Sequence, residues 1–511
     1  MKRSLTQPHT WLLACGVVSI LAGCNRPKTD SGSESGAVGS EESGKVASGA
    51  KVPVTTKSDE ARKLYDEGLV LFDQIRFHEA HQKFQQAAAK DPDFAMAHYQ
   101  LAITSPSNKE TGAHAKQAVA LAGAASEGER LAILSLQAGI DSDPAKSLEY
   151  SKEAVKKYPD DERARLHLGF AYSGLQENEK AVDELKKAIE INPRFSPAYN
   201  LLGYAYRPIG NYDEAEKAFK KYIELVPNDP NPYDSYAELL MKTGRFDESI
   251  AQYRKALSLD PHFVGSHVGI AGNLMYQGKH DQAIAEAEKL NRAAQNDADR
   301  RAALFTRTLV YVDQGKTDQA LKEMQKQYDL GAKIGDTAAM AGDAAQMGDI
   351  LLNAGRADEA KKRFDQALSL QESSGLSSEV KEDARLVHRV QMGRVALKKK
   401  DFATAKSEAA EFLKGAEARQ NDFHIRQAHA LAGKIALKEK NFDEALAHLN
   451  QANQQDPGVL YVIALAHQGK GDQSKAAEMF KRAAESYNLP TLSYVFIRAK
   501  AKQASAAKST S

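Results

Sequence analysis

The chain has 511 residues, 69 of them basic and 68 acidic, so its net charge is close to neutral. This balance argues against a basic surface for a nucleic-acid backbone, and we expect no nucleic-acid partner. The length would ordinarily correspond to three or four globular domains. The sequence contains repeats, however, and stacked repeats bury their apolar faces on their neighbours, so the length does not predict several separate domains.

Residues 1–23 have the features of an export signal. The first residues are basic, and residues 11–21 form an apolar run that is too short to span a bilayer comfortably. The run ends in Leu21-Ala22-Gly23-Cys24, which resembles the lipobox of bacterial lipoproteins. The resemblance implies cleavage before Cys24 and a diacylglycerol on its thiol. The alternative is an ordinary secretory signal followed by a chance cysteine.

The residues after Cys24 bear on location and flexibility. In the lipoprotein family, a residue such as Asn25 is compatible with export to the outer membrane. The resemblance therefore implies a lipid-anchored protein of the bacterial cell envelope, on the outer membrane and facing the periplasm. Residues 24–57 are rich in Gly, Ser and Glu and show no apolar periodicity. We expect them to form a flexible tether.

Residues 58–161 predict the first helical repeats, partly in degenerate form. Gly68, Ala80 and Pro92 mark the first repeat, and Ala95 opens a second that breaks at Ser105-Pro106-Ser107-Asn108. An eroded third repeat has its inter-helix turn at Asp141-Ser142-Asp143-Pro144. We expect helix pairs here as well, with irregular lengths.

Residues 162–297 repeat one pattern four times. Small residues and prolines recur in steps of 34 residues: Gly169, Gly203, Ala237 and Ala271; Ala181, Ala215, Ser249 and Ala283; Pro193, Pro227 and Pro261. The small residues allow two helices to approach closely, and each proline ends the second helix of its repeat. A fixed period of this length predicts stacked helix pairs.

The pattern continues to the end of the chain with looser spacing. Across residues 298–490 the first helices are marked by Gly348, Gly393 and Gly433, at intervals of 45 and 40, so we expect longer helices there. Residues 491–511 predict a helix that caps the last repeat, with a frayed end. The whole pattern closely resembles the tetratricopeptide repeat. The resemblance implies an all-α fold, an α-solenoid of about twelve helix-turn-helix repeats with a C-terminal capping helix.

Motifs for catalysis are not apparent. His78-Glu79-Ala80-His81 is one residue short of the zinc-protease motif, and no third ligand is evident, so we expect two partly exposed histidines. We find no glycine-rich phosphate loop and no nucleophile motif. The sequence predicts a protein without catalytic residues, cofactor or metal.

The family resemblance implies that the first helix of each repeat lines a concave groove. The groove residues of the regular block would be His167, Phe170, Asn200, Tyr204, Arg207, Asp234, Glu238, Met241, Lys242, Asn273 and Tyr276. Aromatic, amide and charged groups together suit an extended peptide or a partner helix. Ordinary solvent-facing residues are the alternative, since helix surfaces are polar in any case.

These features together predict a membrane-anchored, non-catalytic scaffold or adaptor that mediates protein–protein interactions in the bacterial cell envelope. A nutrient-binding lipoprotein of the SusD type is one alternative. Such proteins stack glycans on aromatic residues, often tryptophan, and the only tryptophan here, Trp11, lies in the signal segment. An enzyme is the second alternative, although no catalytic constellation is recognisable.

Overall fold

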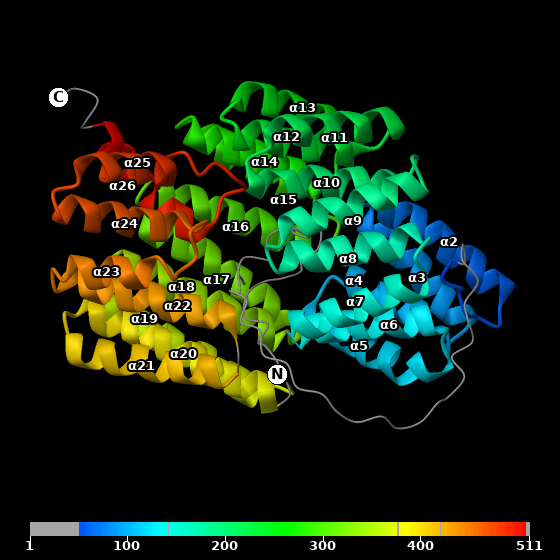
Figure 1. The fold of residues 1–511 in the computed structure, drawn as a ribbon, viewed down its shortest axis with the longest axis horizontal. Helices are drawn as coiled ribbons and strands as arrows, with labels where there is room; N and C mark the ends of the chain where they lie inside the picture. Colours follow the sequence, from blue (N-terminus) through cyan, green and yellow to red (C-terminus); the bar gives the residue numbers. More distant parts are fainter. Residues whose placement is uncertain (1–50, 142, 376–377, 420, 507–511) are drawn as a thin grey trace, which may run out of the picture.

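The computed structural model describes residues 51–141, 143–375, 378–419 and 421–506 (Figure 1). The predicted signal segment, the lipidation site Cys24 and the tether up to residue 50 lie outside the described residues. None of the helices in the described ranges combines the length and apolar character needed to cross a bilayer.

The described residues form 25 α-helices and one short 3-10 helix, and they contain no β-strand (Figure 1). In the first half the helices are α2 (Asp59–Asp73), α3 (Phe77–Lys90), α4 (Ala95–Thr104), α5 (Asn108–Leu121), α6 (Glu127–Ile140), α7 (Pro144–Lys157), α8 (Glu162–Gly174), α9 (Asn178–Ile191), α10 (Ser196–Ile209), α11 (Tyr212–Leu225), α12 (Pro230–Lys242) and α13 (Phe246–Leu259). In the second half they are α14 (Val264–Tyr276), α15 (His280–Ala293), α16 (Asp297–Asp313), α17 (Thr317–Ile334), α18 (Thr337–Asn353), α19 (Ala357–Ser373), α20 (Ser378–Lys398), α21 (Phe402–Ala418), α22 (Asp422–Lys438), α23 (Phe442–Leu449), α24 (Pro457–Gly469), α25 (Gln473–Ala484) and α26 (Leu492–Ala506).

Helices α2 to α25 form twelve consecutive pairs, each packed within itself and against the next pair. This confirms the all-α solenoid of about twelve repeats. The longer helices expected in the second half are also present, because α16 to α22 have 17 to 21 residues and α8 to α15 have 13 or 14.

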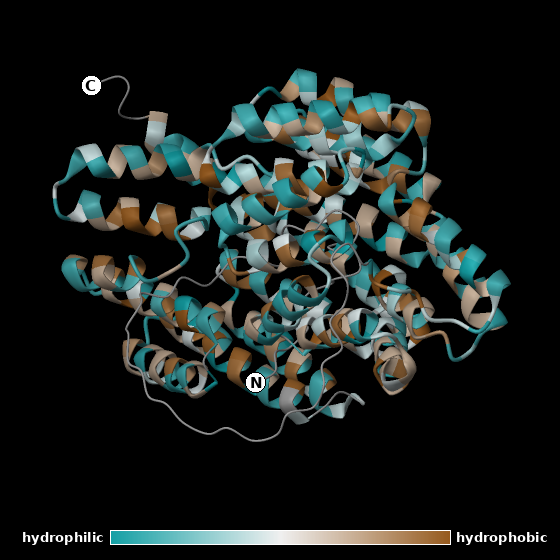
Figure 2. Cartoon of the chain, turned by 45° about the vertical axis from the view of Figure 1, so that its right-hand side comes forward, coloured by the Kyte–Doolittle hydropathy of each residue, from teal (hydrophilic) through white to brown (hydrophobic). Residues whose placement is uncertain are grey.

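Close contact within each pair depends on the small residues of the repeat. A Cβ atom placed on Gly203 of α10 would lie 2.5 Å from the Phe219 ring of α11, which is less than carbon atoms tolerate. Hydrophobic residues, brown in Figure 2, lie among hydrophilic ones on most helices, as amphipathic packing requires. The turn between the two helices then needs a left-handed residue, and Gly210 supplies it with φ +79°.

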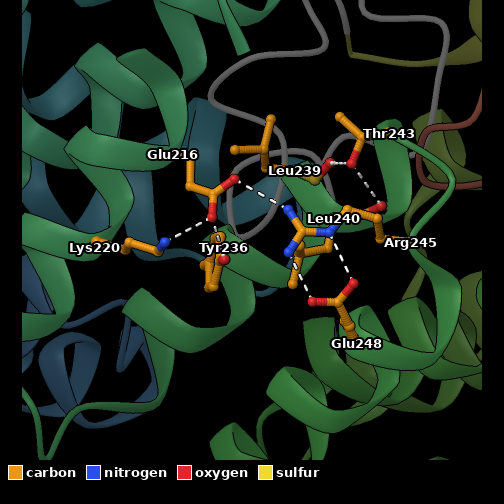
Figure 3. Close-up of polar contacts among 8 residues, drawn as sticks. All are labelled: Glu216, Lys220, Tyr236, Leu239, Leu240, Thr243, Arg245 and Glu248. Atoms are coloured by element: carbon orange, nitrogen blue, oxygen red, sulfur yellow. Dashed lines mark hydrogen bonds and ion pairs between the residues drawn. The ribbon is translucent and has the colours of Figure 1, made fainter. Parts of the chain in front are cut away.

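Polar contacts join neighbouring pairs. Figure 3 shows the Glu216 carboxylate of α11 accepting from the Tyr236 hydroxyl of α12 at 2.7 Å and from the Arg245 guanidinium at 3.1 Å. Arg245 also pairs with Glu248 of α13 at 2.7 Å. These groups are partly exposed, so the network contributes little free energy but specifies the register of three successive helices.

Residues 51–57 differ from the predicted tether. The chain runs extended across three repeats, where the backbone amide groups of Val52, Thr55 and Lys57 donate to the carboxylates of Asp161, Glu129 and Asp91 at 2.8 to 3.0 Å. The prediction of a flexible tether up to residue 57 is therefore corrected: from Lys51 onward the chain belongs to the solenoid. The physical reason is that carboxylates at the end of α3, in the first turn of α6 and at the N-cap of α8 bond the backbone amides.

The C-terminal helix α26 covers the last repeat, as predicted, but it also packs against α16, far away in sequence. Leu492 and Val495 of α26 join one apolar cluster with residues of α12 to α18. Arg498 pairs with Asp313 of α16, with its Nε donating to the carboxylate at 2.9 Å. The solenoid thus curls back, and its C-terminal helices lie beside its middle, red against green in Figure 1.

We expect Gly203→Ala to destabilise the 196–225 helix pair by about 1–3 kcal/mol, because the added methyl group overlaps the Phe219 ring. Chemical unfolding, combined with limited proteolysis to locate the first cleavage, measures the effect. Gly112→Ala is the matched control. Its helix position is open, so the same exchange should stabilise the chain by about 0.5–1 kcal/mol. Equal stabilities of the Gly203 variant and the wild type would contradict the assigned packing.

Candidate protein-binding face

The eleven predicted groove residues all lie on first helices, namely α8, α10, α12 and α14. First helices of neighbouring repeats contact one another: α8 contacts α10, α12 contacts α14, and α14 contacts α16. Units of a curved stack approach most closely along its inner side, so these helices line the inner face. The structure therefore brings the predicted residues to one face of the solenoid.

Six of these residues are buried, contrary to the expectation of a solvent-facing groove: Tyr204, Asp234, Glu238, Met241, Asn273 and Tyr276. His167, Asn200, Arg207 and Lys242 are half-buried, and the Phe170 side chain is 36% exposed. The inner face therefore has an open part on α8 and α10 and a covered part on α12 and α14.

Part of the burial comes from the repeat itself. The Tyr204 ring packs edge-on against Phe219 with centroids 5.3 Å apart. The amide of Asn273 donates to the Ser249 hydroxyl and to the Gly269 carbonyl, both at 2.9 Å. Tyr204 therefore ties together the two helices of its repeat, and Asn273 of α14 ties its repeat to α13 of the preceding one; their contact with a partner protein stays a prediction.

The rest of the covering comes from the chain's own C-terminal end. Residues 487–490, which we call the closing segment, lie between α25 and α26 and contact the inner face. The Arg207 guanidinium donates to the Asn488 side chain at 3.2 Å, and the Tyr276 hydroxyl donates to the Asn488 carbonyl at 2.5 Å. The sequence predicted this segment as the end of the last repeat, because it carries no periodic signal that would indicate a contact with the inner face.

A charged cluster lies beneath the covered part of the face. Arg207 pairs with Glu238 at 3.1 Å and stands over the Tyr204 ring at 5.1 Å. Asp234 accepts a hydrogen bond from the Ser266 hydroxyl at 2.7 Å. Burial, reinforced by the nearby charge of Glu238, raises the pKa of Asp234 well above its usual value. Burial also raises the pKa of Glu238, although Arg207 opposes that shift.

The open part of the face carries a neutral histidine. Burial, with the nearby positive charge of Arg163, lowers the pKa of His167 to about 4, so this imidazole is neutral. His167 and Phe170 are three residues apart on α8 and share a side of that helix. Burial likewise lowers the pKa of Lys242 on the neighbouring α12 to about 8, with help from Arg207, so this ammonium group is still mostly protonated at neutral pH. This surface offers hydrogen bonds and an aromatic ring, with the positive charges of Arg207 and Lys242 beside them.

The histidine pair of α3 has a packing role. The His81 ring is buried, with Nδ1 bonded to the Thr104 hydroxyl and Nε2 to the Gln85 amide, both at 3.0 Å. The expectation of two partly exposed histidines is therefore wrong for His81, because the repeat packs its ring against the next helix pair. Within the described ranges, His, Cys, Asp and Glu side chains form no group of three or more suited to a metal ion.

We expect Asp234→Asn to stabilise the protein at pH 8 by about 0.5–3 kcal/mol. The folded-state pKa of Asp234 is raised, so the contribution of this one group to wild-type stability is fully present below the unfolded-state pKa of about 3.9 and is lost as the pH rises through the folded-state pKa. Asparagine avoids this loss and still accepts from Ser266. Denaturant titrations at pH 4 and pH 8 measure it: the difference should nearly vanish at pH 4, and a less stable variant at pH 8 would contradict the assignment.

Comparison with known proteins agrees with this architecture. Family models described as tetratricopeptide repeat match residues 37–260, 240–305 and 345–374.

Similar solved structures include the tetratricopeptide protein TTC0263 of Thermus thermophilus. It has 26% identity over 42% of this chain and 99% of that chain, and a TM-score of 0.28. A tetratricopeptide repeat protein of Parabacteroides merdae has 18% identity over 56% of this chain and 99% of that chain, with a TM-score of 0.35. Pseudomonas aeruginosa pilF has 20% identity over 43% and 90% of the two chains, with a TM-score of 0.30. The comparison with curated proteins finds no match. The chain is an α-solenoid of helix pairs that are similar to tetratricopeptide repeats.

Proposed function

We propose that this protein is a lipid-anchored, non-catalytic scaffold that holds partner proteins in the bacterial cell envelope, on the periplasmic side of the outer membrane. Tetratricopeptide-repeat proteins are generally protein-interaction scaffolds. The anchor in this proposal is a diacylglycerol on Cys24, supported by the lipobox-like Leu21-Ala22-Gly23-Cys24 and the basic and apolar segments before it. The scaffold role is supported by the inner face of α8 and α10.

The observation that carries the scaffold role is an exposed aromatic ring on this inner face. Phe170, which is 36% exposed, is one of only a few large hydrophobic side chains that the described residues leave exposed. It lies on α8, which contacts α10, and α10 carries Asn200 at another predicted groove position. Among the described residues, the Asn200 side-chain oxygen is buried and has no hydrogen-bond partner. An unpaired amide oxygen is free to accept a hydrogen bond from a bound group or from water.

These groups fit an extended polypeptide. An exposed aromatic ring can anchor an apolar side chain of the partner, while an amide oxygen can accept from its backbone N–H. The neutral His167 beside Phe170 adds a hydrogen-bonding group without adding charge. We therefore place the first contact of the partner on the open part of the inner face.

Replacement of Phe170 and Asn200 by alanine should reduce partner capture at least tenfold, because it removes the ring and the unpaired amide together. The measurement is affinity purification after crosslinking in cells, with quantification of each captured protein. Both positions are at least partly exposed, so helical circular dichroism should be unchanged.

The matched control is Lys217→Ala with Lys221→Ala on the second helix of the same region. These lysines are exposed and pair only with nearby Glu214 and Glu224 of their own helix. Capture should persist in this variant. If the Lys217 and Lys221 changes weaken capture while the Phe170 and Asn200 changes do not, the partner binds elsewhere than on the inner face.

The anchor has a separate test. Cys24→Ser removes the thiol that would carry the lipid, so the variant should take up no radioactive fatty acid and should keep its signal segment. Metabolic labelling followed by gel electrophoresis measures both properties. Equal labelling of the variant and the wild type would refute the lipoprotein proposal without affecting the scaffold role.

A further inference from the structure

We propose that the covered part of the inner face is a second binding site, for an extended partner segment with the order aromatic, asparagine, aliphatic, proline. The closing segment, Tyr487-Asn488-Leu489-Pro490, occupies this site within the same chain. The inference deepens the proposed scaffold function and rests on it, because it names the chemistry of the partner. It also explains why Tyr276 of α14, a predicted groove residue, is buried.

Each residue of the closing segment has its own contact. The Tyr487 ring lies edge-on to Phe246, with centroids 4.9 Å apart, and 5.5 Å from the Tyr276 ring. Asn488 is held from both ends, since its side chain accepts from Arg207 and its carbonyl accepts from Tyr276. Side-chain pockets combined with a bond to the backbone are typical of sites that recognise extended peptides.

Leu489 and Pro490, the last two residues of the closing segment, make the site selective for the shape of the side chains that it binds. Leu489 packs against two apolar clusters, one of which includes Val268 of α14. Pro490 lies directly on Gly272, where an added Cβ atom would come within 2.9 Å of the proline ring. A glycine in the middle of a helix is otherwise unfavourable by about 0.5–1 kcal/mol. Its presence here is explained by the close approach of the proline.

The closing segment can leave the face without unfolding its neighbours. It belongs to the connection 485–491, which joins α25 to α26. The Tyr494 hydroxyl of α26 donates to the Ala484 carbonyl at the end of α25 at 2.6 Å, so the two helix ends lie close together. Seven residues can span about 23 Å when extended. The connection therefore has slack, and Arg498 with Asp313 keeps α26 in place.

Because this connection tethers the closing segment to its site, the closing segment competes strongly with a free partner segment. A tethered segment is present at an effective concentration of about 1 mM. If its intrinsic Kd is about 10 μM, it weakens the binding of a free segment about 100-fold. A partner overcomes this by binding the open part at the same time. Arg207 lies between the two parts, in contact with Glu238 on one side and Asn488 on the other.

The test uses the full chain with Tyr487→Ser, Leu489→Ser and Pro490→Ser, which weaken the closing segment and leave α26 unchanged. The probe is a fluorescein-labelled peptide with the sequence of residues 485–491, followed by fluorescence anisotropy. The peptide should bind this variant at least tenfold more tightly than it binds the wild type. Adding Gly272→Leu should abolish binding, because the new side chain fills the place of the proline.

Backbone hydrogen exchange provides a second measurement that does not depend on the peptide. In the variant, exchange should rise in residues 485–491 and stay low in α24, α25 and α26. Widespread exchange in those three helices would refute the independent release of the segment.

Equal peptide binding by variant and wild type, or binding by neither, would overturn the inference. If sedimentation shows that the wild type dimerises by exchanging the closing segment between two copies, the site is occupied by a second copy of this chain. That result would also overturn the inference. Capture through Phe170 is measured separately. Capture that persists without peptide binding would therefore overturn only this second site and leave the scaffold proposal standing.

Discussion

The architecture depends on the contact between a small residue on each first helix and a large one on the second. At Gly68, Gly203 and Gly348 the neighbour is a phenylalanine ring, Phe84, Phe219 and Phe364 respectively, and a Cβ atom would be 2.5 or 2.6 Å away. The contact sets the distance between the helices of a pair. Every other feature of the inner face follows, because that distance determines which side chains remain on the surface of the stack.

A second contact repeats with the same register and joins each turn to its helix. The side chains of Tyr199, Tyr233 and His267 contact the carbonyl groups of Pro193, Pro227 and Pro261, six residues earlier, at 3.0 to 3.2 Å. The proline ends the preceding helix, and the carbonyl of the proline makes no hydrogen bond within that helix. The side chain of the next helix satisfies it, so the angle between successive repeats is set by a hydrogen bond as well as by packing.

Closure of the solenoid changes the character of the inner face. The closing segment covers Tyr276, whose hydroxyl donates to the Asn488 carbonyl. Asp234 and Glu238 of α12 are buried as well, and burial raises the pKa of both carboxyl groups. Arg207 joins the two regions, because it contacts both Glu238 and Asn488.

The sequence by itself determined the repeats. The steps of 34 residues predicted the helix pairs and the tight contact at Gly203. The wider glycine intervals of 45 and 40 predicted the longer helices after residue 298, and apolar residues at helical spacing after Pro490 predicted the capping helix. Each of these depends on residues within one repeat or the next. Only the tertiary structure decided which part of the inner face is open. The bond from Arg207 to Asn488 joins residues 281 positions apart, and the closing segment has no periodic counterpart that could reveal its destination. Likewise, Lys51 to Lys57 lack apolar periodicity but are ordered by carboxylates on three different repeats. Periodic residues make contacts between neighbouring repeats, so the sequence pattern predicts those contacts. Closure of the solenoid depends on the bend at each repeat, added over many repeats, and no periodic pattern predicts it.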